Sequence, residues 1–144
     1  MTVNPNTVKQ ALRDGGDEYH YRDENCDIGG DRIHESTVKV SHFVVKRDAR
    51  DNGIASTLLD CLETVLREDG VTTLEIEMGA TDYYSLEELD AKRDEIVESD
   101  ERNKHNDPDW HDTTYDFLKN KGFQRLDYIE TYQWGLCVTG HKYV

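Results

Sequence analysis

The sequence predicts a mixed α/β (α+β) fold, in which a twisted, mostly antiparallel sheet is built around a central βαβ unit. Residues 37–46, TVKVSHFVVK, have the β-branched and apolar content of a central strand. From Ile54 the apolar residues recur with the period of a helix, and TTLEIEM (72–78) then returns to alternation. Strand, glycine turn, helix and strand therefore follow one another as in a βαβ unit, whose crossover is right-handed.

The elements before the central strand are predicted from caps and turns. In NPNTVKQALRDGG (4–16), an Asn before Pro, a short apolar stripe and two closing glycines indicate a capped helix. EYHYRD (18–23) and RIHE (32–35) are expected to form a hairpin, with the Gly-Gly segment CDIGGD (26–31) as its turn. The central strand is expected to be apolar on both faces near its end.

The elements after it follow the same logic. The helix from Ile54 should end at Asp69-Gly70. Ser85 and Glu88 form a capping box for an acidic helix, and Asp107-Pro108 offers an N-cap and a first-turn proline for a helix closed by Gly122. FQRLDYIETYQW and LCVTGHKYV should form a final antiparallel pair joined through Gly135. We expect a single domain over residues 1–144 with an acidic insert at about 79–108.

Composition excludes some classes of protein. The chain has 144 residues, with 17 Lys and Arg against 31 Asp and Glu, a net charge of −14. This argues against a nucleic-acid partner, which needs a basic face. Acid spread along the whole chain resembles the surfaces of proteins from salt-loving archaea or their viruses. At molar salt the Debye length is about 3 Å, so the repulsion among these carboxylates is screened.

The cysteines and the apolar runs bear on location. Cys26, Cys61 and Cys137 include no C-x-x-C pair, which argues against a disulfide framework and favours a reducing compartment. No apolar run approaches the ~20 residues that span a bilayer, and MTVNPNTVKQ lacks a secretory apolar region. We expect a cytoplasmic protein without a membrane partner.

RDARDNGIASTLL (47–59) joins the central strand to the helix and is the strongest candidate binding segment. Backbone N–H groups at a helix N-terminus attract anions, and Gly53 would let a ligand approach the backbone closely. Lys46, Arg47 and Arg50 add positive charge. The segment lacks the GK[S/T] of a Walker loop and the three glycines of a dinucleotide fingerprint. A plain βα turn, with glycine only for geometry, is the alternative.

Two segments resemble landmarks of the GNAT N-acetyltransferase superfamily. VVKRDARDNGIASTLLDCL is similar to that family's Arg/Gln-x-x-Gly-x-Gly/Ala loop between a central strand and a helix with a Leu-Leu pair, and the match falls on Arg50, Gly53 and Ala55. DFLKNKGFQRL resembles the second landmark, an aromatic-bearing helix that ends in Gly-Phe, here Gly122-Phe123, before a strand.

The resemblance implies an acetyl-CoA-dependent enzyme that transfers the acetyl group to a primary amine of a small molecule or a protein by direct attack. It implies that Phe43 and Val45 pair through their main chain with the pantetheine arm. It also implies that the turn binds the pyrophosphate through residues Arg50, Asp51, Asn52, Gly53, Ile54, Ala55 and Ser56. The acidic insert is interpreted as a lid or as an element of a possible homodimer.

The catalytic residues are less well defined by the sequence. Similar sequences carry a tyrosine as general acid five residues before the Gly-Phe phenylalanine, and this chain has Leu118 there. Tyr115, one helical turn earlier, is the alternative acid, and His42 on the central strand is the candidate base. Both could instead be structural, and Glu75 and Glu77 fit a solvated strand face better than a catalytic role.

Two further interpretations stay open beside the enzyme. Leu118 at the usual tyrosine position fits a module that binds acyl-CoA with weak or no catalysis. HNDPDWHD, with His105, Asp107, Asp109 and His111, could be read as a metal site, but its irregular spacing and Pro108 argue against it, so we predict no metal.

Overall fold

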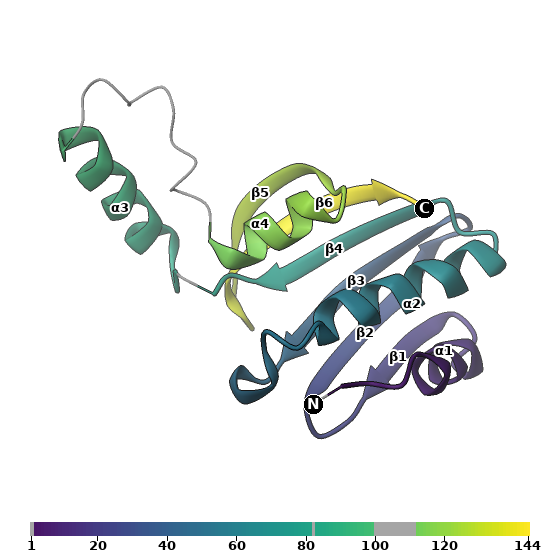
Figure 1. Ribbon diagram of the computed structural model, residues 1–144. Coiled ribbons are helices and arrows are strands. Elements are labelled where there is room, and N and C mark those ends of the chain that lie inside the picture. Colours follow the sequence, from purple (N-terminus) through teal and green to yellow (C-terminus); the bar gives the residue numbers. More distant parts are fainter. Residues whose placement is uncertain (1, 82, 100–111) are drawn as a thin grey trace. The chain divides into compact units, whose positions relative to one another are not determined.

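The structure is a computed structural model that describes residues 2–81, 83–99 and 112–144 (Figure 1). It contains helices α1 (Pro5–Asp14), α2 (Ile54–Glu68), α3 (Leu86–Ser99) and α4 (Thr113–Asn120), a 3-10 turn η1 (Arg47–Ala49), and strands β1 (Glu18–Arg22), β2 (Cys26–His34), β3 (Thr37–Val45), β4 (Thr73–Gly79), β5 (Gln124–Thr131) and β6 (Gly135–Tyr143). The strands form one six-stranded sheet in the order β1-β2-β3-β4-β6-β5. The predicted α+β class with a mostly antiparallel sheet is confirmed.

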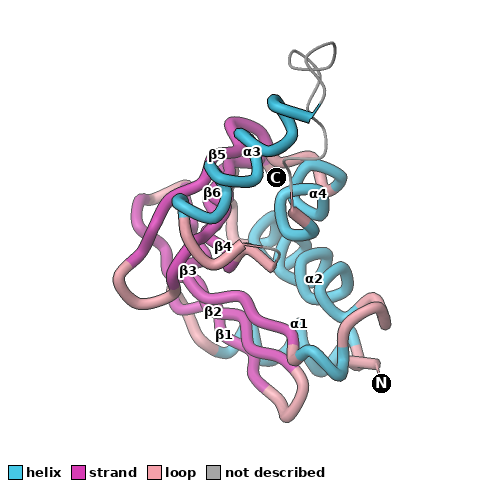
Figure 2. The backbone as a smooth tube through the Cα atoms, turned by 90° about the vertical axis from the view of Figure 1, so that its left-hand side faces the viewer, coloured by secondary structure: helices cyan, strands magenta, loops and turns pink. Residues whose placement is uncertain are grey.

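The chain divides into two compact units, which are described separately. Unit 1 comprises Met1–Met78 and His141–Val144, and unit 2 comprises Gly79–Gly140. In unit 1, α2 runs along one face of the strands (Figure 2), and α1 contacts both α2 and β1. The buried side chains of this unit alternate along the strands and follow the apolar stripes of the helices: Val8, Leu12, Tyr19, Ile28, Val38, Val40, Leu58, Leu59, Leu62, Val65, Leu66, Leu74 and Ile76.

The helices of unit 1 begin and end where the sequence predicts. The Asn4 side chain accepts hydrogen bonds from the amides of Asn6 and Thr7 at the start of α1. The helix α2 begins at Ile54 and ends at Glu68, with Asp69 as its C-cap. Gly70 follows at φ 77°, in the left-handed region that glycine adopts at helix ends.

The predicted hairpin turn at CDIGGD is wrong, because these residues belong to β2. The turn between β1 and β2 instead lies at residues 23–25, where the Asp23 side chain accepts hydrogen bonds from the amides of Asn25 and Cys26. Gly30 is closely packed against β3, because a Cβ there would lie 3.1 Å from a methyl group of Val40. The Gly-Gly pair therefore reflects a crowded strand.

The strand β3 contains a bulge that changes which side chains face the core. Gly29 of β2 pairs with His42 and Gly30 pairs with Val40, so β3 has one extra residue at this point. Val38 and Val40 are buried before the bulge, and Phe43 and Val45 after it. The end of β3 has apolar residues on both faces, as expected, but Val44 is 42% exposed, so only the face of Phe43 and Val45 is buried.

Beyond the bulge, β3 and β4 separate. Their parallel register runs from Thr37 opposite Thr73 to Val40 opposite Ile76, and it includes no residue of β3 after Val40. Both strands continue past this point, β3 to Val45 and β4 to Gly79. The two parallel strands therefore separate toward their carboxyl ends, where β3 leads into the turn before α2.

In unit 2 the predicted capping box at α3 is present in part: Ser85 accepts a hydrogen bond from the amide of Glu88, and the Glu88 carboxylate accepts from the amide of Tyr84. The predicted start of the next helix is wrong. The helix α4 begins at Thr113, because Asp112 has an extended backbone (φ −90°, ψ 177°) and is the N-cap. Asp107 and Pro108 lie outside the described residues. The helix closes at Lys121-Gly122 as expected.

Candidate active site

The turn before α2 presents backbone amides at the positive end of a fifteen-residue helix. Gly53 is the N-cap, with φ 75° and ψ 11°, and it provides no side-chain cap. Within the described residues, no amide from Asp51 to Ser56 donates a hydrogen bond. These N–H groups are oriented for an anion or for water.

Side chains of the turn fix its shape. The Asn52 side-chain amide donates to the carbonyl oxygens of Ala49 (3.1 Å) and Arg50 (3.0 Å). Arg50 donates from Nε to the carbonyl oxygen of Val45, 3.1 Å away, and so ties the turn to the end of β3. Asp51 has a positive φ of 65°, which is uncommon for a residue other than glycine. Arg50 and Asn52 therefore fix the conformation of the turn.

The residues predicted to pair with a pantetheine arm lie where β3 leaves β4. Phe43 and Val45 are buried after the bulge, and their antiparallel partners on β2 are Ile28 and Cys26. On the opposite edge of β3, the register with β4 has already ended at Val40. The main-chain pairing of Phe43 and Val45 with a ligand, which the family resemblance implies, stays a prediction.

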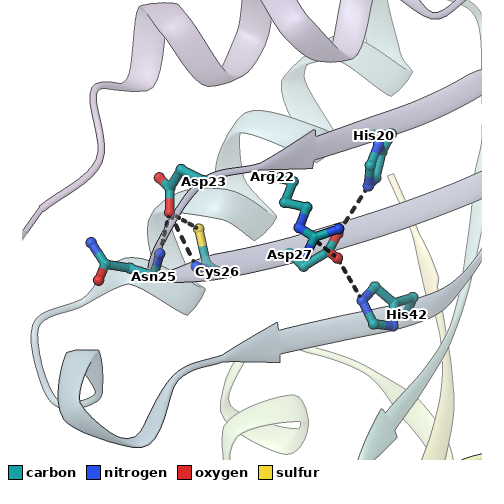
Figure 3. Close-up of polar contacts among 7 residues, drawn as sticks. All are labelled: His20, Arg22, Asp23, Asn25, Cys26, Asp27 and His42. Carbon is teal, nitrogen blue, oxygen red and sulfur yellow. Dashed lines mark hydrogen bonds and ion pairs between the residues drawn. The ribbon is translucent and has the colours of Figure 1, made fainter.

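His42 lies on the face of the sheet opposite α2, in a polar cluster with Asp27, His20 and Arg22 (Figure 3). Its Nε2 lies 2.9 Å from Oδ2 of Asp27, and His20 Nε2 lies 2.9 Å from Oδ1 of the same residue. Arg22 Nε lies 3.8 Å from Oδ2. Burial acts to raise the pKa of Asp27, but the hydrogen bonds from His20 and His42 outweigh it and lower that pKa.

The sequence interpretation missed Asp27 and His20, because it placed Asp27 in a turn. Had residues 26–34 been read as a strand, alternation would have put Asp27 on the exposed face, next to strands that carry histidines.

Glu75 and Glu77 are engaged in ion pairs on β4. Glu75 Oε1 lies 3.5 Å from Nδ1 of His141, and Glu77 Oε1 lies 3.0 Å from Nζ of Lys39. Both carboxylates are partly exposed. This arrangement agrees with the view of Glu75 and Glu77 as residues of a solvated strand face.

In unit 2, Tyr115 is half-buried on α4 and stacks on Tyr128, with ring centroids 5.6 Å apart and an interplanar angle of 19°. Burial, with the nearby charges of Asp116 and Asp127, raises the pKa of Tyr115. Its phenol is therefore protonated at neutral pH, as a proton donor must be. Leu118 is fully buried in the core of this unit.

Asp112 is a second residue that the sequence interpretation missed. It is fully buried, and its two carboxylate oxygens accept from the amides of Tyr115 (2.8 Å) and Thr81 (2.6 Å). Its own amide donates to the hydroxyl of Tyr128. Asp112 therefore joins the start of α4 to the segment after β4 and fixes the helix that carries Tyr115.

The metal interpretation concerns His105, Asp107, Asp109 and His111, all of which lie outside the described residues. Among the described residues there is no group of three or more His, Cys, Asp or Glu side chains arranged to hold a metal ion. None of the described helices is long and apolar enough to cross a membrane.

The fold and its open βαβ unit define the class of protein to which this chain is similar. Residues 18–87 match the model of the acetyltransferase (GNAT) family. This stretch contains strands β1 to β4, the turn before α2 and α2 itself. No curated protein sequence matches the chain.

Solved structures of acetyltransferases share the fold. An aminoglycoside 6'-N-acetyltransferase complexed with coenzyme A aligns with 96% of this chain and 89% of its own, at 14% identity and a TM-score of 0.55. The aminoglycoside 6'-N-acetyltransferase from Enterococcus faecium aligns over the same shares, at 15% identity and a TM-score of 0.54.

Ard1 from Thermoplasma volcanium is a third structure of this kind. It aligns with 83% of this chain at 18% identity and a TM-score of 0.51. The match spans 63% of Ard1, less than two thirds of its length. At these identities the likeness establishes the fold.

Proposed function

We propose that this chain is a GNAT acetyltransferase that transfers the acetyl group of acetyl-CoA to a primary amine of a small molecule or a protein. The observation that carries the proposal is the opening between β3 and β4, which leads into a turn whose amides from Asp51 to Ser56 have no acceptor among the described residues. A pyrophosphate is the kind of ligand that such amides satisfy.

The binding residues follow from this geometry. The amides of Asp51, Asn52, Gly53, Ile54, Ala55 and Ser56 would donate to the pyrophosphate, and the main chains of Phe43 and Val45 would pair with the amide-bearing arm. Arg50 takes a structural part, because its Nε already donates to Val45. Lys46 and Arg47 are exposed and add positive charge beside the turn.

The chemistry needs a base for the amine and a proton for the departing thiolate. We assign the base to His42, which lies on β3 just past the last residue paired with β4. We assign the acid to Tyr115, because its phenol is protonated at neutral pH and it lies on the aromatic helix before Gly122-Phe123.

A module that binds acyl-CoA with weak or no catalysis is the second candidate. The complete burial of Leu118 favours it, because no substitute for the usual tyrosine is available at that position. Tight binding of CoA without turnover of any amine would support this candidate.

We further propose that residues 1–144 form one acetyltransferase domain in a cytoplasmic protein. The family match runs through residue 79, where the two units meet in sequence, and two aligned acetyltransferase structures cover 96% of the chain. The buried thiols of Cys26, Cys61 and Cys137 are compatible with a reducing compartment.

The proposed function is tested by two measurements on the full chain. Isothermal titration with CoA and with acetyl-CoA should show binding. Mass spectrometry should then detect an acetylated product (+42 Da, the mass of an acetyl group replacing a proton) from a panel of a polyamine, an aminoglycoside, lysine and a peptide with a free N-terminus. Tyr115→Phe should lower kcat and leave the Kd for CoA unchanged. Absence of CoA binding would refute the proposal.

A further inference from the structure

The cluster around Asp27 has a specific construction across three strands. In the register of the sheet, Gly29 of β2 stands between His20 of β1 and His42 of β3. A Cβ at Gly29 would lie 3.4 Å from Cδ2 of His20 and 3.9 Å from Cβ of His42. His20 and His42 therefore flank the same residue of β2, one from each neighbouring strand.

Asp27 lies two residues before Gly29, on the same face of β2. Its two oxygens are divided between the rings, each 2.9 Å from the Nε2 of one histidine (Figure 3). The His42 side chain is 27% exposed, whereas that of His20 is 58% exposed. The Asp27 carboxylate therefore contacts two rings. The less exposed ring, His42, lies where β3 and β4 separate, and the more exposed ring is that of His20.

We propose that Asp27 is the positioning residue for His42 as the base of the acetyl transfer, and that His20 holds the same carboxylate in place through its other oxygen. The inference rests on the proposed function and adds two residues to it. The amine nitrogen bonds to the thioester carbonyl carbon, and the C–S bond breaks with its electron pair going to sulfur. One amine proton goes to His42, and the sulfur receives a proton from Tyr115 or solvent.

The bond to Asp27 defines which nitrogen of His42 can act. An ionised carboxylate only accepts hydrogen bonds, so Nε2 of the neutral ring carries its hydrogen and donates it. The lone pair that takes up a proton is then on Nδ1. The low pKa of Asp27 keeps it ionised throughout the pH range in which histidines titrate.

The shared carboxylate connects the two rings. Each ring contacts one oxygen of Asp27, so His20 helps to fix the carboxylate that orients His42. Other charged groups face the same side of this sheet: Arg22 on β1, Lys39 on β3, Glu75 and Glu77 on β4, and His141 on β6. Lys39 is paired with Glu77 and His141 with Glu75, and His42 Nε2 lies 2.9 Å from Asp27 Oδ2.

The kinetic test compares kcat and KM for wild type and two variants. Asp27→Asn should lower kcat at neutral pH by about 10-fold or more and leave KM nearly unchanged, because the carboxylate that orients the His42 ring is gone. His20→Gln keeps that carboxylate and should lower kcat less. The matched control is His141→Gln, which removes another paired histidine from this face and should change neither quantity.

A merely structural cluster would give a different result. Asp27→Asn and His20→Gln would then change stability and leave kcat of the folded enzyme unchanged. Added imidazole should restore activity to His42→Ala, and it should not restore Asp27→Asn, which retains its own ring. A kcat for folded Asp27→Asn equal to that of the wild type overturns the inference.

Long-range ¹H–¹⁵N NMR of the full chain tests the same inference without turnover. His42 should show the Nε2–H tautomer in the wild type, and Asp27→Asn should weaken the preference for it. A Nδ1–H tautomer overturns the inference even if the enzyme is active. Loss of CoA binding by the wild type would instead refute the proposed function, so the two failures are distinguishable.

Discussion

Replacing Gly53 with alanine tests whether the left-handed turn before α2 is shaped to present its amides. A Cβ at Gly53 would meet no atom within 4 Å, so the change acts only through the backbone, at φ 75°. A residue with a side chain in this region costs about 1–2 kcal/mol. Alanine also lowers the conformational entropy of the unfolded chain, which stabilises the folded state by about 0.4–1 kcal/mol. We therefore expect a net destabilisation of about 1 kcal/mol.

Gly70→Ala is the matched control at the other end of the same helix. Gly70 has φ 77° and also has no atom within 4 Å of a Cβ, so its cost should be nearly equal. In urea denaturation both variants should lose about 1 kcal/mol. In calorimetric titration only Gly53→Ala should bind CoA about 10-fold more weakly, the equivalent of one lost hydrogen bond to a charged group. Equal CoA affinity in two equally destabilised variants would refute the assignment of the turn.

Three further predictions concern stability. Asp112→Ala should destabilise the chain by about 2–3 kcal/mol in urea, because it removes the N-cap of α4 and leaves the Thr81 amide without its acceptor; a loss below about 1 kcal/mol would contradict this role. Burial opposes ionisation of Asp23, but hydrogen bonds from Tyr21, Asn25 and Cys26 lower its pKa. The ionised Asp23 therefore stabilises the fold above its unfolded pKa near 4, and this contribution is lost as pH falls through its lower pKa in the folded state. Asp23→Asn should flatten the decline in stability below about pH 4. The melting temperature should rise between dilute buffer and molar KCl, since salt screens the net charge of −14; an unchanged value would contradict it.

The sequence predicted the βαβ unit well because its signals are local. The period of the apolar residues after Ile54 and the alternation around Leu74 and Ile76 do not depend on distant parts of the chain. The capping residues Asn4 and Ser85 were found for the same reason, since each caps an amide two or three residues away.

The errors arose where distant residues decide the local structure. A Gly-Gly pair usually marks a turn, but Gly30 is required because Val38 and Val40 of the next strand crowd it. The true turn depends on one side chain, Asp23. Once the strand boundary was misplaced, the face of Asp27 could not be predicted, because a shift of one residue moves a side chain to the other face.

The same register explains why the candidate site was only partly predicted. The turn proposed to bind CoA is continuous in sequence, so its residues could all be named from the motif. The cluster of His20, Asp27 and His42 comes from three strands, and its members are brought together by strand pairing and by the bulge in β3. No spacing within the sequence encodes that contact.

The net charge leads to a last prediction, about ligand binding. Long-range repulsion between a chain of charge −14 and a ligand rich in phosphate should weaken binding in dilute buffer. Between 0.1 and 1 M salt the Debye length falls from about 10 Å to about 3 Å, which screens this repulsion more than direct contacts between amides and phosphate. The affinity for CoA should therefore rise with KCl in calorimetric titrations, opposite to the trend for a basic phosphate-binding protein. If affinity falls steadily over this range, the local cations Lys46 and Arg47 dominate binding, and the account of the turn as a backbone site is wrong.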